Sequence, residues 1–146
     1  MPPSEVDYLV IGAGARGMAF ADHILHGDPS ATVALVDRRP TPGGHWNDAY
    51  PFVRLHQPAL YYGVTSTPLG SGGRDLASKP VLLDYYADVQ RRMEATGRCH
   101  FLLGHTYEGE GVCRSVSDPE LSVVLRARKR LVDSVYVQVE VPAMRP

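Results

Sequence analysis

The sequence has little cysteine, almost no lysine and no long apolar run. Its two cysteines, Cys99 and Cys113, stand 14 positions apart without the CxxC spacing of a zinc or redox site. We therefore expect two ordinary small apolar side chains, with no disulfide and no metal site. No apolar stretch approaches the roughly 18 residues of a membrane span, and no basic-then-apolar leader opens the chain. These absences predict a soluble, cytoplasmic protein.

Neither sign of charge dominates. The chain carries 15 basic residues, of which 13 are arginine, against 16 acidic ones, and the net charge is −1. A charge so near zero gives no electrostatic reason to expect nucleic acid or an anionic membrane as a partner. The composition, 44% hydrophobic and 21% charged over 146 residues, is that of one ordinary globular domain.

The first forty residues show a regular pattern. Residues 6–11 and 31–37 are short apolar runs rich in β-branched side chains, as expected of buried parallel strands. Between them lie a glycine-rich turn and a stretch whose apolar residues recur at helical spacing until Gly27. Strand, turn, helix and strand in this order predict one βαβ unit.

The turn has the pattern Gly12-x-Gly14-x-x-Gly17. In such a motif the first glycine allows the tight turn, the second lets the backbone approach a pyrophosphate, and the third lets the helix pack closely. Asp37 ends the second strand, 25 positions after Gly12, where a carboxylate can accept hydrogen bonds from ribose hydroxyls. The pattern predicts dinucleotide binding; the alternative is a plain strand–helix turn with an incidental acid.

The turn does not identify the dinucleotide. A carboxylate at the ribose repels the 2′-phosphate of NADP, whereas Arg38 or Arg39 could receive such a phosphate. FAD and NAD are both compatible with Asp37.

The remainder of the chain is less regular. Residues 38–78 hold many prolines and glycines with interleaved aromatics, which we interpret as a long functional loop beside the cofactor. Residues 78–96 return to helical periodicity, with Ser78 as a possible cap. Short strands are expected at 100–103 and 112–116, and alternation over 122–127 and 131–141 predicts an antiparallel hairpin or meander turning near Lys129.

The segment after Asp37 resembles a known family. The run PGGHW at 42–46, together with the glycine turn and the acid, is similar to the FAD-binding segment of class B flavin monooxygenases. These include the flavin-containing, Baeyer–Villiger and N-hydroxylating enzymes. The run AYPFVRLH at 49–56 looks like the YPGxRxD stretch of the Baeyer–Villiger members. The resemblance covers somewhat under half of the chain.

The resemblance implies an α/β fold, a Rossmann-like FAD-binding domain in three layers (β-β-α) with a parallel sheet and a small antiparallel meander. It also implies an incomplete enzyme, because the family's second GxGxxG, for NADPH, and its FxGxxxHxxxWP signature are absent from these residues. The chain would then be the N-terminal FAD-binding portion of a larger protein that uses NADPH or NADH as co-substrate. Where many relatives end the last strand with an ATG-type sequence, residues 137–141 read VQVEV before Pro142.

The resemblance also assigns residues. The glycine turn would hold the pyrophosphate, Asp37 the ribose, and Gly43, Gly44 and Trp46 the loop along the flavin. His56 stands where the family has an acid or amide near the flavin's reactive edge, and it is the one catalytic candidate. Tyr107 lies in a segment that corresponds to the family's adenine contact. The candidate cofactor-binding residues are Gly12, Gly14, Ala15, Gly17, Asp37, Arg38, Gly44, Trp46, Arg54, His56 and Tyr107.

Three hypotheses about function follow. The first is the FAD-binding part of an NAD(P)H-dependent, monooxygenase-like flavoprotein oxidoreductase. The second is an NAD(P)-binding Rossmann oxidoreductase without flavin, which leaves the PGGHW run unexplained. The third is a non-catalytic remnant or a subunit that acts through a partner.

Overall fold

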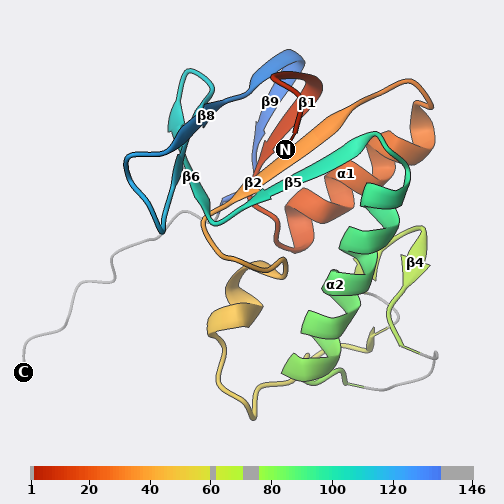
Figure 1. Cartoon of the computed structure of the whole chain (residues 1–146). Coiled ribbons are helices and arrows are strands. Elements are labelled where there is room, and N and C mark those ends of the chain that lie inside the picture. The colour runs from red at the N-terminus through yellow and green to blue at the C-terminus, as the bar shows by residue number, and fades with distance from the viewer. Residues whose placement is uncertain (1, 60–61, 71–75, 136–146) are drawn as a thin grey trace, which may run out of the picture.

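The computed structural model describes residues 2–59, 62–70 and 76–135. Its centre is a four-stranded sheet with the strand order β5-β2-β1-β9, in which every pair of neighbours is parallel (Figure 1). These strands are β1 (Glu5–Ile11), β2 (Val33–Asp37), β5 (Cys99–Leu103) and β9 (Arg126–Asp133). The chain moves from β1 to β2 and β5 on one side and returns as β9 on the other, so the strand order reverses at β1.

Two further layers cover the sheet. On one face lie α1 (Ala15–Gly27), which links β1 to β2, and α2 (Lys79–Ala95), which precedes β5 (Figure 1). The other face packs against an antiparallel meander of β6 (His105–Gly109), β7 (Val112–Ser115) and β8 (Ser122–Val124). The predicted three-layer α/β fold with a parallel sheet and a small meander is confirmed. Neither described helix is long and apolar enough to cross a membrane.

Strand β2 shows why the sheet carries layers on both faces. All five of its residues are buried. Val33 and Leu35 belong to the cluster formed with the helices, whereas Ala34 and Val36 belong to the cluster formed with the meander. Because successive side chains of a strand point to opposite faces, a strand covered on both sides is apolar at every position.

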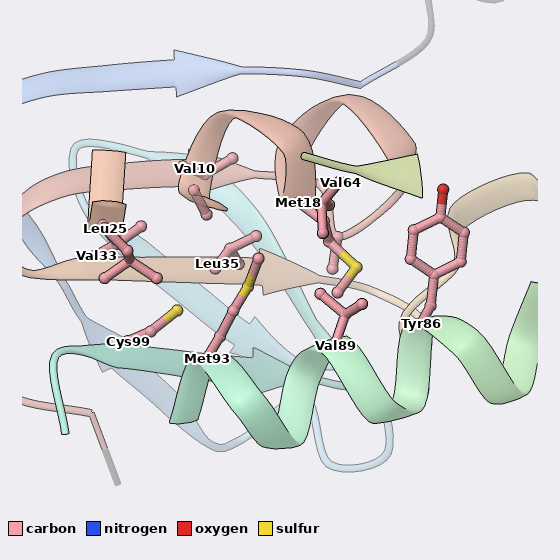
Figure 2. Packing of buried hydrophobic residues seen from close by; sticks show 12 residues of the cluster. Val10, Met18, Leu25, Val33, Leu35, Val64, Tyr86, Val89, Met93 and Cys99 are labelled. Carbon is pink, nitrogen blue, oxygen red and sulfur yellow. The ribbon is translucent and has the colours of Figure 1, made fainter. Parts of the chain in front are cut away.

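The helix side of the core is built from regularly spaced residues. The buried positions of α2 are 82, 86, 89 and 93, and they form one stripe along the helix. Figure 2 shows Val89 and Met93 pointing toward Leu35, with Met18 approaching from α1. Cys99 is buried in this cluster and is free, as expected, and burial raises the pKa of its thiol to about 12.

The segment 38–78 contains its own small elements. These are the 3-10 helix η1 (Gly44–Asp48) and an antiparallel pair of β3 (Gly63–Val64) and β4 (Thr67–Pro68). Trp46, Leu55 and Leu69 form a third apolar cluster with Leu82 of α2, which fixes the segment beside that helix. Of the other aromatics, Tyr50 is 70% exposed and stacks on an exposed phenylalanine, and Tyr61 lies outside the described residues.

The predicted hairpin turning near Lys129 is wrong. Residues 126–133 form one continuous strand, β9, parallel to β1, and 122–124 belong to the meander as β8. The chain changes sheets at Leu125, which is fully buried and donates its N–H to the Gly111 carbonyl at 2.8 Å. Alternation of apolar and polar residues is the same in a hairpin and in two strands of different sheets, so the pattern did not reveal the change. Residues 136–141 of the expected last strand lie outside the described residues.

Asp7 joins three strands at the amino-terminal end of the sheet. Its Oδ2 accepts the Thr32 N–H at 2.9 Å, and its own N–H donates to Thr32 Oγ1 at 2.9 Å. Its Oδ1 accepts Nε of Arg128, on β9, at 3.1 Å. The Thr32 N–H, followed by the Arg128 guanidinium, holds the pKa of Asp7 below its usual value.

This carboxylate should make the fold sensitive to acid. A group with a lowered pKa stabilises the fold above its unfolded pKa, here 3.8, and that stability is lost as the pH falls through the folded value. We predict that Asp7→Asn reduces the drop in unfolding free energy between about pH 6 and about pH 3. Urea unfolding followed by circular dichroism at both pH values measures the drop; equal drops in the variant and the wild type would contradict the prediction.

Arg98 closes the carboxyl end of α1. Its Nη2 donates to the Leu25 carbonyl at 2.8 Å, and its Nη1 donates to the carbonyls of Asp28 and Ala31, both at 3.0 Å. The last carbonyls of a helix lack partners within the helix, and a cation is favoured at this end of the helix dipole. Arg98 therefore ties α1 to the start of β5.

We predict that Arg98→Ala lowers the free energy of unfolding by about 2 kcal/mol, because three carbonyls lose a charged donor. The matched control is Arg91→Ala, since Arg91 is exposed and, within the described part of the chain, pairs only with Asp88, both residues lying on α2. Its cost should be about 0.5 kcal/mol or less. Urea unfolding of the two variants decides the point, and equal costs would show that Arg98 is not a structural clamp.

Candidate functional site

The glycine turn lies where all four parallel strands end. Strand β1 ends at Ile11, β2 at Asp37, β5 at Leu103 and β9 at Asp133. The carboxyl ends of parallel strands meet at the same edge of a sheet. In open α/β sheets ligands bind at this edge, at the point where the strand order reverses. The turn after β1 occupies that point.

Gly12 and Gly17 permit two close backbone approaches. Gly12 has φ +104°, and a Cβ at this residue would lie 2.6 Å from Ser134 Oγ. A Cβ on Gly17 would lie 2.0 Å from the Gly12 carbonyl oxygen. The first glycine therefore allows the turn out of β1, and the third allows α1 to pack directly on it.

Gly14 brings a second turn to the first. A Cβ on Gly14 would lie 3.3 Å from Gly44 Cα, and a Cβ on Gly44 would lie 2.9 Å from Gly14 Cα. The N–H of Gly43 donates to the Ala13 carbonyl at 2.9 Å. The Gly43–Gly44 turn is thus held against the start of α1, and the space that a side chain at Gly14 would need is taken by the protein's own backbone.

The amino terminus of α1 has no side-chain cap. Gly14 is its N-cap, and the first turn holds no acidic residue. The first bond within the helix runs from the Met18 N–H to the Gly14 carbonyl at 3.0 Å, so the N–H groups of Ala15 and Gly17 have no acceptor in the helix. N–H groups without an acceptor in the helix and the positive end of the helix dipole together suit an anion such as a pyrophosphate.

Asp37 links the glycine turn to the segment that follows β2. Its side chain is buried, with Oδ2 accepting the Ala13 N–H and Oδ1 accepting the Arg39 N–H, both at 2.8 Å. A carboxylate has about four lone-pair sites, so each oxygen retains capacity for one more donor. Ribose hydroxyls are donors of this kind.

The two arginines after Asp37 differ in their surroundings. Arg39 Nε donates to Asp48 Oδ2 at 3.1 Å and its Nη2 contacts the same oxygen, which holds the pKa of Asp48 below its usual value. Arg38 is exposed. Arg39 is therefore held in an ion pair with Asp48 of η1. Of the two arginines, Arg38 stays the candidate to bind a 2′-phosphate.

No protein-family model matches the chain. It is 42% identical over 97% of its length to the uncharacterized protein Rv2000 of Mycobacterium tuberculosis, of which it covers 28%. It is 32% identical over 65% of its length to the putative FAD-containing monooxygenase MymA of Mycobacterium tuberculosis, covering 19% of that protein. It is 30% identical over 69% of its length to the probable FAD-binding monooxygenase AlmA of an Acinetobacter species, covering 20% of it.

Solved structures agree with these relatives. The crystal structure of cyclohexanone monooxygenase from Rhodococcus sp. Phi1 bound to NADP+ is 26% identical and matches with a TM-score of 0.64, covering 98% of this chain and 29% of that one. The chain resembles part of a flavin-dependent monooxygenase. A flavin-containing monooxygenase from Stenotrophomonas maltophilia, 17% identical with a TM-score of 0.62 over 90% of this chain and 38% of its own, shares the fold. The resemblance predicted from the motifs is confirmed, and the chain spans 28% of the length of the first curated relatives.

Among the residues that the flavin monooxygenase resemblance singles out, Trp46 points inward. Its Nε1 donates to the Tyr62 hydroxyl at 3.0 Å, and the Tyr62 ring meets that of Tyr86 edge-on at 6.5 Å between centroids. The Tyr86 hydroxyl is buried and has no hydrogen-bond partner in the described part of the chain, and burial raises its pKa (Figure 2). Trp46 therefore anchors the turn at Gly44 to the cluster beside α2.

Arg54 and His56 lie on another part of the same segment. Arg54 Nη1 donates to the Leu76 carbonyl at 3.3 Å, and the Leu55 N–H donates to the Ala77 carbonyl at 2.9 Å. His56 is exposed. The hydrogen bonds of this stretch reach residues 76 and 77, and Leu55 packs in the cluster with Trp46, so no contact among the described residues joins the Arg54 or His56 side chain to the glycine turn.

Tyr107 has a structural task in the meander. Its hydroxyl accepts the Gly111 N–H at 3.1 Å, which holds the turn between β6 and β7. The start of β6 nevertheless lies close to the segment that follows β2, because the Gly104 N–H donates to the Arg39 carbonyl at 2.9 Å. An adenine contact through the backbone of β6 stays a prediction.

Two residues that stabilise the turns of the site, Ser134 and Asn47, were not predicted from the sequence. Ser134 Oγ donates to the Ile11 carbonyl at 2.7 Å, so the end of β9 supports the turn after β1. Asn47 binds carbonyls of residues 41–44 and so holds the second turn. The Ser134 contact spans 123 positions along the chain, and no local pattern indicates it.

The close approach at Gly17 yields a sharp test. We predict that Gly17→Ala costs about 3 kcal/mol or more of unfolding free energy, because the new methyl group meets a backbone oxygen that cannot move away. The control is Gly27→Ala on the same helix, where nothing lies within 4 Å of the added atom. That change should be neutral or stabilise by up to about 1 kcal/mol. Urea unfolding measures both, and similar effects would refute the assigned packing.

Proposed function

We propose that this chain forms the FAD-binding part of an NAD(P)H-dependent flavoprotein oxidoreductase of the monooxygenase type. The observation that carries the proposal is the meeting of three features at one edge of the sheet: the uncapped start of α1, the Gly43–Gly44 turn and the Asp37 carboxylate. The monooxygenase relatives, named as FAD-containing or FAD-binding, support it.

The donors and acceptors fit the parts of FAD in order. The N–H groups at the start of α1 suit the pyrophosphate, and the free lone pairs of Asp37 suit the ribose hydroxyls. The start of β6 lies close to the segment after Asp37 and suits the adenine. On the other side, the turn at Gly44, anchored by Trp46, would border the flavin.

FAD held by these residues would supply the redox chemistry, which is hydride acceptance and electron transfer to oxygen. The protein's own residues bind and orient the cofactor and keep water away from it. In this proposal His56, at the exposed stretch after Arg54, is a hydrogen-bonding side chain near the flavin edge and the one candidate for a catalytic role.

The second candidate is NAD(P) binding without flavin, which the glycine turn and Asp37 also fit. The Asp37 carboxylate at the ribose would repel a 2′-phosphate. Since Arg39 is committed to Asp48, only Arg38 of the two arginines could offset this repulsion, so NADP fits this turn less well than NAD or FAD. The packing of Gly44 on Gly14 favours FAD over both, because it joins the glycine turn to the run at 42–46, which resembles the FAD-binding segment of flavin monooxygenases.

Titration of the purified chain tests the proposal. We predict saturable FAD binding with a dissociation constant of about 10 µM or tighter, and binding of NAD+ and NADP+ at least about tenfold weaker. FAD fluorescence anisotropy and quenching of Trp46, the only tryptophan, report the binding. Saturation by NAD+ but not FAD would establish the second candidate. A folded chain that binds none of the three nucleotides would refute both and favour a non-catalytic subunit.

A further inference from the structure

We infer that Asn47 is a positioning residue for the cofactor, because its side chain fixes the Gly43–Gly44 turn against the start of α1. The inference rests on the proposed FAD site. It concerns a residue outside the glycine motifs, which acts through the backbone of those motifs.

The Asn47 carboxamide uses both of its ends on one short segment. Its Nδ2 donates to the Gly44 carbonyl at 3.0 Å and the Pro42 carbonyl at 3.2 Å, and it lies 3.5 Å from the Thr41 carbonyl. Its Oδ1 accepts the Thr41 hydroxyl at 2.7 Å. One planar amide therefore holds the chain on both sides of Gly43.

The segment needs such support because two successive residues are left-handed. Gly43 has φ +114° and Gly44 has φ +57°. Glycine adopts these angles without steric cost, but it loses more conformational freedom on ordering than any other residue. Carbonyls fixed before and after Gly43 restrict the turn to one shape.

That shape is what places the turn on the helix start. The Gly43 N–H reaches the Ala13 carbonyl at 2.9 Å, and the Ala13 N–H in turn donates to Asp37. Gly44 packs on Gly14 with no room for a side chain on Gly44 and only a tight fit for one on Gly14. A displaced turn would therefore alter both the phosphate donors and the flavin side of the proposed site.

Asn47 is itself held from α2. Lys79 Nζ donates to the carbonyls of Asn47 at 3.0 Å and Ala49 at 2.6 Å. Asn47 is half-buried and belongs to none of the three apolar clusters among the described residues. Removing its amide should therefore disturb the turn and leave the core intact.

The test compares Asn47→Ala and Asn47→Asp with the wild type in FAD titrations. Asn47→Asp keeps the acceptor for the Thr41 hydroxyl and replaces the donor with an oxygen that faces carbonyls, so it should fail like alanine. Each variant should weaken FAD binding by about tenfold. The control is Gln90→Ala, since Gln90 is a half-buried amide like Asn47 but pairs with Glu94 on α2, far along the chain from the turn.

Two further readouts separate positioning from mere stabilisation. At saturating FAD, the visible circular dichroism of the flavin should change in both Asn47 variants and not in Gln90→Ala. The urea midpoint of the FAD-free protein should stay near that of the wild type.

Each outcome decides a different claim. If the wild type binds no FAD, the proposed function fails and the inference with it. If the wild type binds FAD and both Asn47 variants bind it equally well with an unchanged flavin spectrum, only the inference fails. Weaker binding that tracks a lower urea midpoint, with an unchanged spectrum at saturation, would also overturn it by showing a purely structural role.

Discussion

The site depends on close backbone packing at the carboxyl edge of the sheet. Gly17 packs over the carbonyl of Gly12 and Gly14 packs against Gly44, so Gly12, Gly17 and Gly44 have no room for a Cβ and Gly14 has little. Backbone meets backbone directly here, and among the described residues α1 begins without a side-chain cap and without an acidic residue in its first turn. The same packing shortens the distance from strand to helix and brings the start of α1, where the helix dipole is positive, to the edge of the sheet, which favours an anion there.

Asp37 adds an electrostatic contribution, because its carboxylate binds a backbone N–H of the same glycine turn. Its carboxylate is buried at the end of β2, where an isolated charge would be costly, and two backbone N–H groups compensate it. One of them belongs to Ala13, inside the glycine turn. The acid therefore shapes the glycine turn itself, so a variant at this position would change the structure of the turn together with any recognition by the carboxylate.

Local patterns predicted the local parts of the molecule. The βαβ unit was predictable because strand, glycines and helix adjoin in sequence and each carries its own period. Strand β9 was not, since alternation over residues 122–133 does not reveal that buried Leu125 carries the chain from one sheet to another. The motif at 42–46 indicated a cofactor loop, but only the fold shows that this loop packs on Gly14 and is held there by Asn47.

The site is assembled from segments that are distant in the chain, and this links binding to folding. Ser134, at the end of β9, donates to the carbonyl of Ile11, and the Gly104 N–H ties β6 to Arg39. Donors for a dinucleotide are therefore in place only when the sheet and the meander have both formed. A ligand that binds the folded state alone shifts the folding equilibrium toward it by mass action. A dinucleotide bound here would thus stabilise β9 and the meander, including residues that it never touches.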